Sequence, residues 1–486
     1  MRVAILHYHL RRGGVTRVIE HSLTALVDRG IEVVVLGAEG SGLRPDLREY
    51  FEEVPELAYQ SGSSRISVDD LDRVLRAVAR RRLGAEPDVW HVHNHHLAKN
   101  TSLTELVAVM AKRGERLLLH VHDFPEDGRA ENYRVLLRDL GGSKVADGRE
   151  PLYPVGERIL YGVLNSRDFA ILGRAGIPEE QRRLLANPVA ANSVQDRSGK
   201  LPGLHGERLI LYPTRAIRRK NLGEFLLWAA LGAEDEVYGC TLAPENPSAR
   251  PIYERWVSLA ETLRLPTEFE LGDRPGLAFE ELIAASELLL STSVAEGFGL
   301  AFLEPWLLNR PIVGRNLPAI TSDFVAENLR LDHLYDRLKV PLNWIDTQSL
   351  RRSLERAVAE NYARYSLPLA DELVEQTYQD LTAGGVIDFG RLDESFQECV
   401  IRRVCVAPSC RAEIVPSGLQ KPRSSSVLTH NREVVIDRFG LPAYGEKLEH
   451  CYRSLLEGRD GKLEWIEPRR VLDQFLDPTL FSFLRS

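Results

Sequence analysis

Short apolar runs alternate with helical apolar periodicity from the start of the chain. Residues 3–7 (VAILH) predict a strand, and the apolar positions from Val15 to Val27 recur every three or four residues, which predicts a helix. Gly30 follows that helix as a residue free to take the left-handed conformation. The run 31–36 (IEVVVL) predicts a second strand. Strand, loop, helix and strand in this order form a right-handed βαβ unit, which begins a parallel sheet.

The alternation continues and then starts again after a polar break. Further strands are expected at 88–92, 117–121 and 160–164. Residues 192–207 (NSVQDRSGKLPGLHGE) lack periodicity and contain Gly, Pro and Ser, so we expect a linker there. A second α/β pattern follows, with a strand at 208–212, a helix at 222–231 and a strand at 287–290. From about residue 330 the pattern is mainly helical, with a loop expected at 411–427 and helical periodicity again at 444–456.

The fold class expected from this pattern is α/β, with two Rossmann-like doubly wound domains. A chain of 486 residues is too long for one hydrophobic core, since cores stop growing at roughly 250–300 residues. Sheets of this kind bind ligands in the crevice outside the carboxyl ends of their strands. The functional residues are therefore sought where strands end.

Composition excludes several classes of partner. The chain is 44% hydrophobic and 27% charged, with a net charge of -8, so no global electrostatic attraction draws it to nucleic acid or to an anionic membrane. Five cysteines without C-x-x-C spacing indicate reduced thiols. No apolar run approaches the roughly 20 residues of a membrane span, and no signal peptide is recognisable at the amino terminus. We expect a cytoplasmic protein.

The most informative segment is 291–304 (STSVAEGFGLAFLE), where a predicted strand turns through two glycines into an apolar helix. Glu296 would lie in the turn, and Glu304 about two helical turns further on. The amides of Phe298–Leu300 would then point outward at a helix amino terminus, which favours an anionic diphosphate. The alternative is two solvated glutamates around a helix cap.

Two further segments carry polar chemistry. Arg215 and Lys220 lie five residues apart in YPTRAIRRKN, on a strand-to-helix connection, and paired cations stabilise the charge of a departing diphosphate. A solvated basic turn is the alternative for that segment. Gly13 and Gly14 lie in the first strand-to-helix loop, where backbone can approach a phosphate or an acceptor, although Gly-Gly also marks any tight turn.

Histidines are concentrated early in the chain, since nine of the thirteen precede residue 123. This clustering fits a polar cleft. A zinc site at HVHNHH is disfavoured because His91 and His93 have no Cys or carboxylate at ligand spacing. Asp70 and Asp72 form a D-x-D sequence, but they open a helix expected at 71–83, where capping explains them. The arginines of that helix fit a solvated outer helix, with an anionic membrane surface as the alternative.

These segments together resemble the retaining glycosyltransferases of the GT-B fold with an E-x7-E signature, the large family 4 ("glycosyl transferases group 1") that includes bacterial mannosyltransferases, sucrose synthases and trehalose synthases. The resemblance runs in the family's order from residue 1 to about 325, and weakly again at 444–456. It rests on the segments 13–36, 118–123 (LLHVHD, which follows Leu117), 163–167 (VLNSR), 185–189 (LANPV), 212–221 and 291–304.

The resemblance implies a role for each matching residue. Glu304 would hold the ribose hydroxyls, Glu296 the donor sugar near its 3-hydroxyl, and Arg215 and Lys220 the diphosphate, while His122 would contact the donor sugar at the reaction centre. The turn Gly297, Phe298, Gly299 and Leu300 would also bind the donor, and Gly13, Gly14 and Arg17 would form a phosphate or acceptor loop. Pro305 and Trp306 depart from the family, where alanine is commoner after the second glutamate, and LANPV replaces the usual P-N-G-[VI]-[DN].

The resemblance also assigns the domains. An N-terminal acceptor-binding domain is expected at 1–195, and a nucleotide-sugar-binding domain with a helical insertion at 208–430. A helical segment at 431–486 would pack back towards the N-terminal domain. The residues from 330 to 430 exceed the minimal fold and would shape the acceptor site or an oligomer contact.

The activity expected is transfer of a hexose, with retention and without a metal, from a nucleotide diphosphate sugar (UDP, GDP or ADP) to a small polar acceptor. No cofactor is expected, and neither nucleic acid nor a membrane is an expected partner. A nucleotide-sugar epimerase or hydrolase, a transferase acting on a lipid or polysaccharide, and a non-catalytic sugar-nucleotide-binding protein remain as alternatives. A phosphorylase would need a lysine-bound pyridoxal phosphate, which nothing in the sequence indicates.

Overall fold

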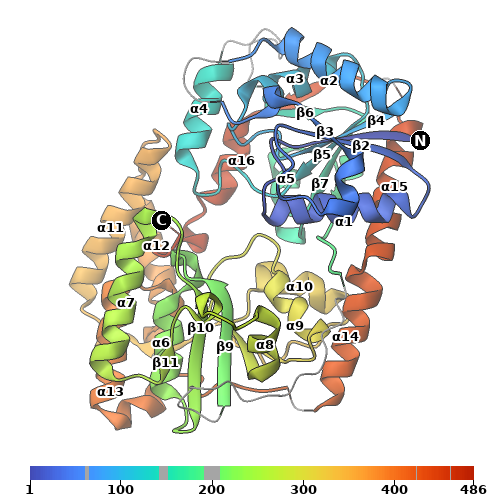
Figure 1. The fold of residues 1–486 in the computed structure, drawn as a ribbon. Coiled ribbons are helices and arrows are strands. Elements are labelled where there is room, and N and C mark those ends of the chain that lie inside the picture. The colour runs from blue at the N-terminus through green and yellow to red at the C-terminus, as the bar shows by residue number, and fades with distance from the viewer. Residues whose placement is uncertain (61–64, 142–150, 191–207, 423, 460, 486) are drawn as a thin grey trace. The chain divides into compact units, whose positions relative to one another are not determined.

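The structure is a computed structural model that describes residues 1–60, 65–141, 151–190, 208–422, 424–459 and 461–485. The chain divides into two compact units (Figure 1): unit 1 comprises 1–190 and 437–477, and unit 2 comprises 191–436 and 478–486. The linker expected at 192–207 lies outside the described residues. Within the described part of the chain, no helix combines the length and the apolar character needed to cross a membrane.

Unit 1 is built on a seven-stranded parallel sheet. Its strands, in spatial order, are β3 (Phe51–Glu53), β2 (Glu32–Gly37), β1 (Arg2–Leu6), β4 (Val89–His93), β5 (Leu117–Val121), β7 (Ile159–Val163) and β8 (Arg182–Leu184). Its helices are α1 (Gly14–Val27), α2 (Val68–Leu83), α3 (Thr101–Lys112), α4 (Ala130–Leu140), α5 (Ser166–Ala175), α15 (Leu441–Glu457) and α16 (Pro468–Phe475). A short antiparallel pair joins β6 (Tyr153–Val155) to β16 (Glu464–Ile466).

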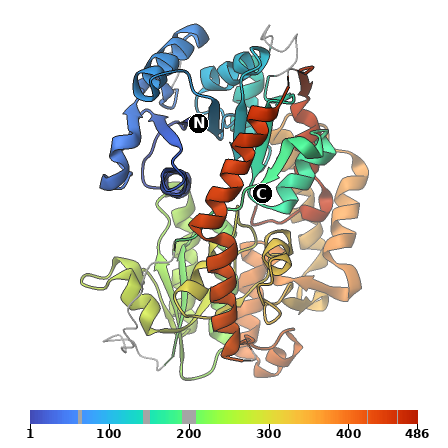
Figure 2. The ribbon, with the colours of Figure 1, turned by 90° about the vertical axis from the view of Figure 1, so that its right-hand side faces the viewer.

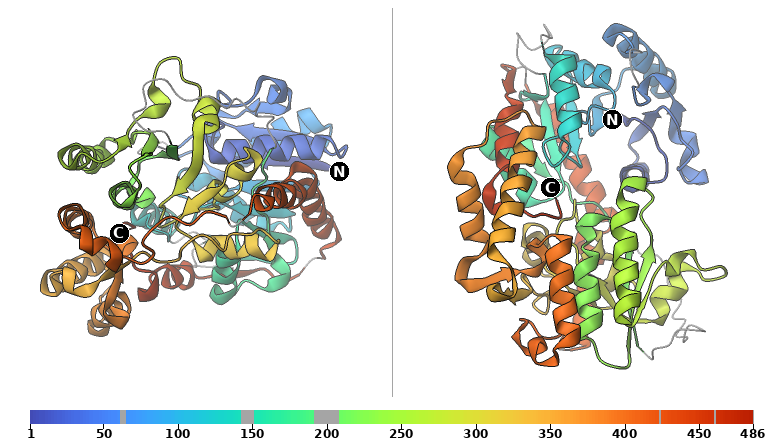
Figure 3. Two further views of the ribbon diagram at one scale, coloured as in Figure 1. Left: turned by 90° about the horizontal axis from the view of Figure 1, so that it is seen from below. Right: turned by 90° about the vertical axis from the view of Figure 1, so that its left-hand side faces the viewer.

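Helices cover both faces of this sheet. Because successive side chains of a strand point to opposite faces, each strand contributes residues to two cores. On β1, Val3 and Ile5 belong to a core shared with α1 and α15, whereas Ala4 and Leu6 belong to a core shared with α2, α3, α4 and α5. The left view of Figure 3 shows α1 and α15 side by side. Helix α15 also packs against β4, β5 and β7 (Figure 2), so it covers the middle of the sheet.

Unit 2 contains a five-stranded parallel sheet in the order β11 (Thr267–Glu268), β10 (Glu236–Leu242), β9 (Arg208–Arg215), β12 (Ser286–Ser291) and β13 (Ile312–Gly314). Its helices are α6 (Leu222–Leu231), α7 (Arg250–Leu263), α8 (Phe279–Ala285), α9 (Glu304–Leu307), α10 (Pro318–Ala326), α11 (Thr347–Arg364), α12 (Asp371–Leu381), α13 (Glu394–Val406) and most of α14 (Ser426–Phe439). Strands β14 (Lys339–Pro341) and β15 (Val386–Asp388) form an antiparallel pair. The right view of Figure 3 shows α6, α7 and α13 packed beside one another.

The expected fold class is confirmed, and the expected strands and helices of both sheets are present. The helical character after residue 330 is also confirmed, with β14 and β15 added to it. The loop expected at 411–427 is shorter at both ends. Its start belongs to a 3-10 helix, Pro408–Glu413, and its last residues belong to α14.

The expected C-terminal segment 431–486 does not stay with one unit. Residues 437–477 belong to unit 1, where α15 packs on α1 and α16 packs on α5. The last nine residues belong to unit 2 instead, because Phe483 is buried in the unit 2 core and the carbonyl of Phe481 accepts a hydrogen bond from Arg391 at 3.2 Å.

A buried ion cluster anchors the start of α6. Arg315, 4% exposed, donates to both oxygens of Glu224 at 2.6–3.1 Å and to Asp388 at 2.8 Å. Glu224 also accepts a hydrogen bond at 2.8 Å from Asn221, the residue before the helix. Burial raises the pKa of Glu224, and the Arg315 guanidinium offsets only part of that rise. The cluster therefore fixes the segment that ends at Lys220.

Removing the cation of this cluster should strongly destabilise unit 2. Arg315→Met leaves Glu224 and Asp388 buried without a countercharge, and breaking a buried pair in this way costs about 3–5 kcal/mol. Urea denaturation followed by tryptophan fluorescence measures the loss. Arg351→Met, which removes an exposed pair with Glu375, is the matched control and should shift the midpoint little. Equal midpoint shifts in the two variants would contradict the role given to the cluster.

Candidate active site

Lys220 is held in place by the ends of two neighbouring strands. It closes a short 3-10 turn, Arg218–Lys220, that follows β9. Its carbonyl accepts hydrogen bonds from the hydroxyls of Tyr212 on β9 and Thr292 after β12, both at 3.0 Å. Since β9 and β12 are adjacent and parallel, their carboxyl ends meet at the same edge of the sheet. The backbone of Lys220 is therefore fixed at the edge where ligands of such sheets bind.

Glu296 meets this lysine from the β12 side. Lys220 Nζ donates to Glu296 Oε1, and Arg219 donates to Oε2 of the same carboxylate at 3.1 Å. Arg219 also donates to the carbonyl of Ala295 at 2.8 Å, and the amide of Val294 donates to the carbonyl of Arg219 at 2.9 Å. The two loops that follow β9 and β12 are thus tied together by backbone and side-chain bonds.

Burial and charge act in opposite directions on this ion pair. Burial would raise the pKa of Glu296, but Lys220 and Arg219 hold that pKa below its usual value, so the carboxylate stays ionised. Burial lowers the pKa of Lys220, and Glu296 offsets part of that shift. The carboxylate of Glu296 and the cations of Lys220 and Arg219 thus meet at a site that is largely shielded from water.

The other two basic residues of the segment point elsewhere. Arg215 donates to Glu245 at 2.8 Å and to the carbonyl of Ala243 at 3.3 Å. Arg218 donates to Glu394 at 2.6 and 3.0 Å. A solvated basic turn is therefore not what the structure shows, because all four cations of RAIRRK have partners. Glu296 is joined by Lys220 but not by Arg215.

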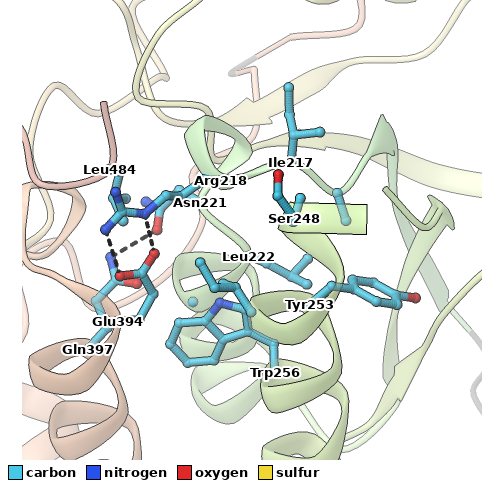
Figure 4. Close-up of a pocket in the computed structure, with 14 residues that line it drawn as sticks. Ile217, Arg218, Asn221, Leu222, Ser248, Tyr253, Trp256, Glu394, Gln397 and Leu484 are labelled. Atoms are coloured by element: carbon cyan, nitrogen blue, oxygen red, sulfur yellow. Dashed lines mark hydrogen bonds and ion pairs between the residues drawn. The ribbon is translucent and has the colours of Figure 1, made fainter. Parts of the chain in front are cut away.

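A cavity of about 180 Å³ lies beside Arg218, between α6, α7 and α13. In Figure 4 the Arg218–Glu394 pair and the Gln397–Asn221 hydrogen bond stand at one side of it, and Trp256 and Tyr253 at the other. Neither Lys220 nor Glu296 lines this cavity. It is separate from the ion pair at the strand ends.

The helix expected after Glu296 is not formed, and this prediction was wrong. A 3-10 turn, Leu300–Phe302, is followed by the four-residue helix α9, which begins at Glu304. Proline has no amide hydrogen and fits only the first turn of a helix, so Pro305 prevents a helix from running through 298–307. Gly297 is exposed, Phe298 is buried and Leu300 is half-buried, and these three residues stand at a turn rather than at a helix amino terminus. Within this turn, Gly299 has a φ of 92°, in the left-handed region that favours glycine.

Glu304 lies half-buried at the start of α9. A 3-10 turn, not two turns of one helix, separates it from Glu296. The helical spacing expected between the two glutamates is therefore absent. The assignment of Glu304 to the ribose now rests on the family resemblance alone.

In unit 1, the Gly-Gly loop begins a helix as expected. Gly13 precedes α1 with an extended backbone, and its carbonyl accepts a hydrogen bond from the amide of Arg17 at 3.1 Å. A side chain added at Gly14 would meet nothing within 4 Å, and one added at Gly13 only the carbonyl of Arg11 at 3.8 Å. The glycines therefore leave open space around the start of α1.

His122 directly follows β5 and is buried. Its backbone amide donates to Asn94 Oδ1 at 2.8 Å, and its Nε2 lies 2.8 Å from His93 Nδ1. Burial lowers the pKa of His122 to about 4, although Asp123 opposes the shift. The ring is neutral at pH 7, so it can position a hydroxyl group but cannot supply a cation to a phosphate.

The D-x-D sequence lies in the first turns of α2, but the cap expected of it is made by Ser67. Ser67 caps α2 by accepting from the amide of Asp70, and Asp72 accepts from Arg76 at 2.8 Å and from Arg113 at 2.5 Å. The arginines at the end of α2 pair with Glu52 and Glu86. The basic face of this helix is therefore neutralised within the unit.

Comparison with known proteins finds similar glycosyltransferases. Residues 12–167 match the family model described as Glycosyltransferase Family 4. Mannosylglucosyl-3-phosphoglycerate synthase from Petrotoga mobilis is 26% identical over 477 residues, which cover 91% of this chain and 89% of that protein. These two similarities support a glycosyltransferase of family 4.

Solved structures show the same fold for this glycosyltransferase. A glycosyltransferase from Rickettsia africae is 13% identical, covers 94% of this chain and 99% of its own, and superposes with a TM-score of 0.54. HepE from Anabaena, in a complex with UDP and glucose, is 14% identical, covers 93% and 98% of the two chains, and has a TM-score of 0.51. The fold is GT-B.

Sequence reasoning missed three residues of the site of this glycosyltransferase. Arg219 contacts Glu296, Tyr212 supports Lys220, and Ser293 lies 2.8 Å from the Tyr212 hydroxyl. The run RRK gave no signal for which cation would face the carboxylate. The hydroxyl residues at both strand ends were visible in the sequence as polar positions after apolar runs.

The glycine turn after Glu296 supplies a matched pair of substitutions. Gly299→Ala should destabilise the enzyme by about 1–3 kcal/mol, because φ is positive there and the new methyl would lie 2.8 Å from Ile320. Gly297→Ala should cost much less, since a methyl at that position meets nothing within 4 Å. Thermal unfolding of the two variants tests the difference. Equal losses would show that the turn is not strained at Gly299.

Proposed function

We propose that this glycosyltransferase transfers a hexose with retention from a nucleotide diphosphate to a small polar acceptor, without a metal at the diphosphate. The observation that carries the proposal is the contact of the half-buried Lys220 and Arg219 with Glu296 at the carboxyl ends of β9 and β12. A site of this kind offers cations for phosphate oxygens and a carboxylate for sugar hydroxyls. Both are fixed before the donor binds, which is the condition for electrostatic stabilisation of a transition state.

The mechanism that the family resemblance implies is front-face displacement. The acceptor hydroxyl attacks the anomeric carbon on the side from which the diphosphate leaves, so one carbon–oxygen bond breaks as another forms, and a phosphate oxygen takes the acceptor proton. Lys220 would stabilise the negative charge that develops on the diphosphate, together with Arg215, which would exchange its exposed partner Glu245 for a phosphate oxygen. Glu296 would hold a donor-sugar hydroxyl, and neutral His122 would contact the sugar at the reaction centre. Glu304 would hold the ribose, and the turn from Gly297 to Leu300 would lie against the donor.

For the acceptor we propose a sugar linked to a phosphorylated organic acid. The Petrotoga mobilis relative is a mannosylglucosyl-3-phosphoglycerate synthase, and the similarity spans both units. The exposed segment that includes Arg11, Arg12 and Arg17 borders the open space at Gly13 and Gly14 and supplies positive charge for a carboxylate and a phosphate.

Removing the diphosphate cations should weaken nucleotide binding. Lys220→Met and Arg215→Met should each raise the Kd for the nucleoside diphosphate by about 10- to 100-fold, since a charge-assisted hydrogen bond contributes about 1.5–3 kcal/mol. Isothermal titration with UDP, GDP and ADP gives the affinities. Arg218→Met is the control, because its side chain turns to Glu394, and its nucleotide affinity should stay near wild type. An unchanged Kd in Lys220→Met would refute the clamp.

The acceptor and the stereochemistry are tested together. Incubation with each nucleotide sugar and with glucosyl-3-phosphoglycerate, 3-phosphoglycerate or glucose should release nucleotide fastest with the anionic glycoside. Proton NMR of the product should show the anomeric configuration of the donor, and added Mg²⁺ or Mn²⁺ should not raise the rate. Without any acceptor, release of the nucleotide would favour a hydrolase and conversion of the donor into an epimeric nucleotide sugar would favour an epimerase. An inverted product would refute the mechanism.

A further inference from the structure

Two identical three-residue sequences end neighbouring strands of unit 1. The sequence His-Val-His occurs at 91–93, the end of β4, and at 120–122, where β5 ends, and the register pairs His93 with His120. The valines between them point into the core beneath α2 and α3, so the four imidazoles share the opposite face of the sheet. On that face Tyr452 of α15 contacts His91.

This group of imidazoles is buried in an otherwise apolar place, and its ring nitrogens are not all paired. His91, His93 and His120 are each 0% exposed. His91 Nδ1 lies 2.9 Å from the Tyr452 hydroxyl, and His93 Nδ1 lies 2.8 Å from His122 Nε2. His93 Nε2 has no hydrogen-bond partner. Buried polar atoms without partners are rare, and an ion or water accounts for many of them.

We propose that His91, His93 and His120 bind one divalent transition-metal ion, with zinc the preferred ion. One ring nitrogen from each of the three residues lies within 4.8 Å of the others. His91 Nε2 and His120 Nδ1 are 3.2 Å apart, close to the edge of a tetrahedron, which is about 3.3 Å when metal–nitrogen bonds are about 2.0 Å. Imidazole is a preferred ligand of zinc, and three histidines with one open position form a known type of zinc site.

The surroundings suit such a site. Burial lowers the pKa of His91 to about 3 and the pKa values of His93 and His120 well below the usual range, so all three rings are neutral, the form that binds a metal. The Nδ1 atoms of His91 and His93 face Tyr452 and His122, as outer hydrogen-bond partners of metal-bound histidines do. The strand that carries His91 and His93 offers no Cys or carboxylate at ligand spacing, but the neighbouring strand supplies His120 as the third ligand.

The ion would fix the hydrogen-bonding state of His122. With His93 Nε2 on the metal, His93 Nδ1 carries the proton and donates it to His122 Nε2. The neutral His122 ring then carries its own proton on Nδ1 and presents a donor there. Metal binding in unit 1 is thus separate from the cations of unit 2 that are proposed to hold the diphosphate, and it serves to position a residue of the reaction centre.

Metal analysis of the untagged full-length enzyme tests the site. Protein purified without chelators should contain about one zinc per chain by mass spectrometry of the elements. After removal of the metal with dipicolinate, one equivalent of Co²⁺ should give the intense visible absorption of tetrahedral coordination and should raise the unfolding temperature by several degrees. His93→Phe and His120→Phe should lose the absorption and the temperature rise.

Matched controls keep the outcome decisive. His122→Ala removes an imidazole of the same group that is not a ligand, and it should still bind one Co²⁺ with the same spectrum. His430→Ala, at the surface, should do so as well. Folding of each variant is checked by circular dichroism. If the phenylalanine variants do not fold, the Co²⁺ absorption and the rise in unfolding temperature of the wild-type enzyme still decide whether the site exists. A folded wild-type enzyme that neither retains zinc nor binds Co²⁺, or binding that survives in His93→Phe, would overturn the proposal.

Discussion

The contact between Lys220 and Glu296 is the constraint on which the site depends. Two loops leave adjacent parallel strands and are joined where those strands end by an ion pair that burial alone would disfavour. The hydroxyls of Tyr212 and Thr292 fix the lysine backbone, and Arg219 shares the carboxylate. A buried charge pair with these supports is held in one geometry and needs no rearrangement to meet a charged ligand.

The rest of unit 2 maintains that geometry. Asn221 follows Lys220 and connects it to the buried cluster of Glu224 and Arg315, while Gln397 on α13 donates to Asn221 at 2.9 Å. The helical residues after 330, longer than the minimal fold requires, thus contribute a direct support to the start of α6. In unit 1, the comparable support is the stack of imidazoles behind His122, which a metal ion would hold rigid.

Local pattern predicted much of this structure, and non-local contacts explain what it missed. The helix 222–231 and the strand 117–121 were predicted to the residue, because their apolar positions are dense and their ends are marked. The helix after Glu296 was wrong because Pro305 outweighs the apolar pattern around it. The partner of Arg215 and the role of Arg219 depend on how loops from separate strands meet, and the register of β4 with β5 brings His120 to His93. None of these pairings has a signal within one segment.

Comparing one nucleotide sugar with its nucleoside diphosphate tests the central claim most directly. Titration calorimetry of the wild-type enzyme, Lys220→Met and Glu296→Gln with both ligands separates contacts to phosphate from contacts to sugar. The account predicts that Lys220→Met weakens both ligands to a similar extent, whereas Glu296→Gln removes most of the preference for the sugar-bearing ligand. A Glu296→Gln enzyme that keeps the full preference of the wild type would contradict it.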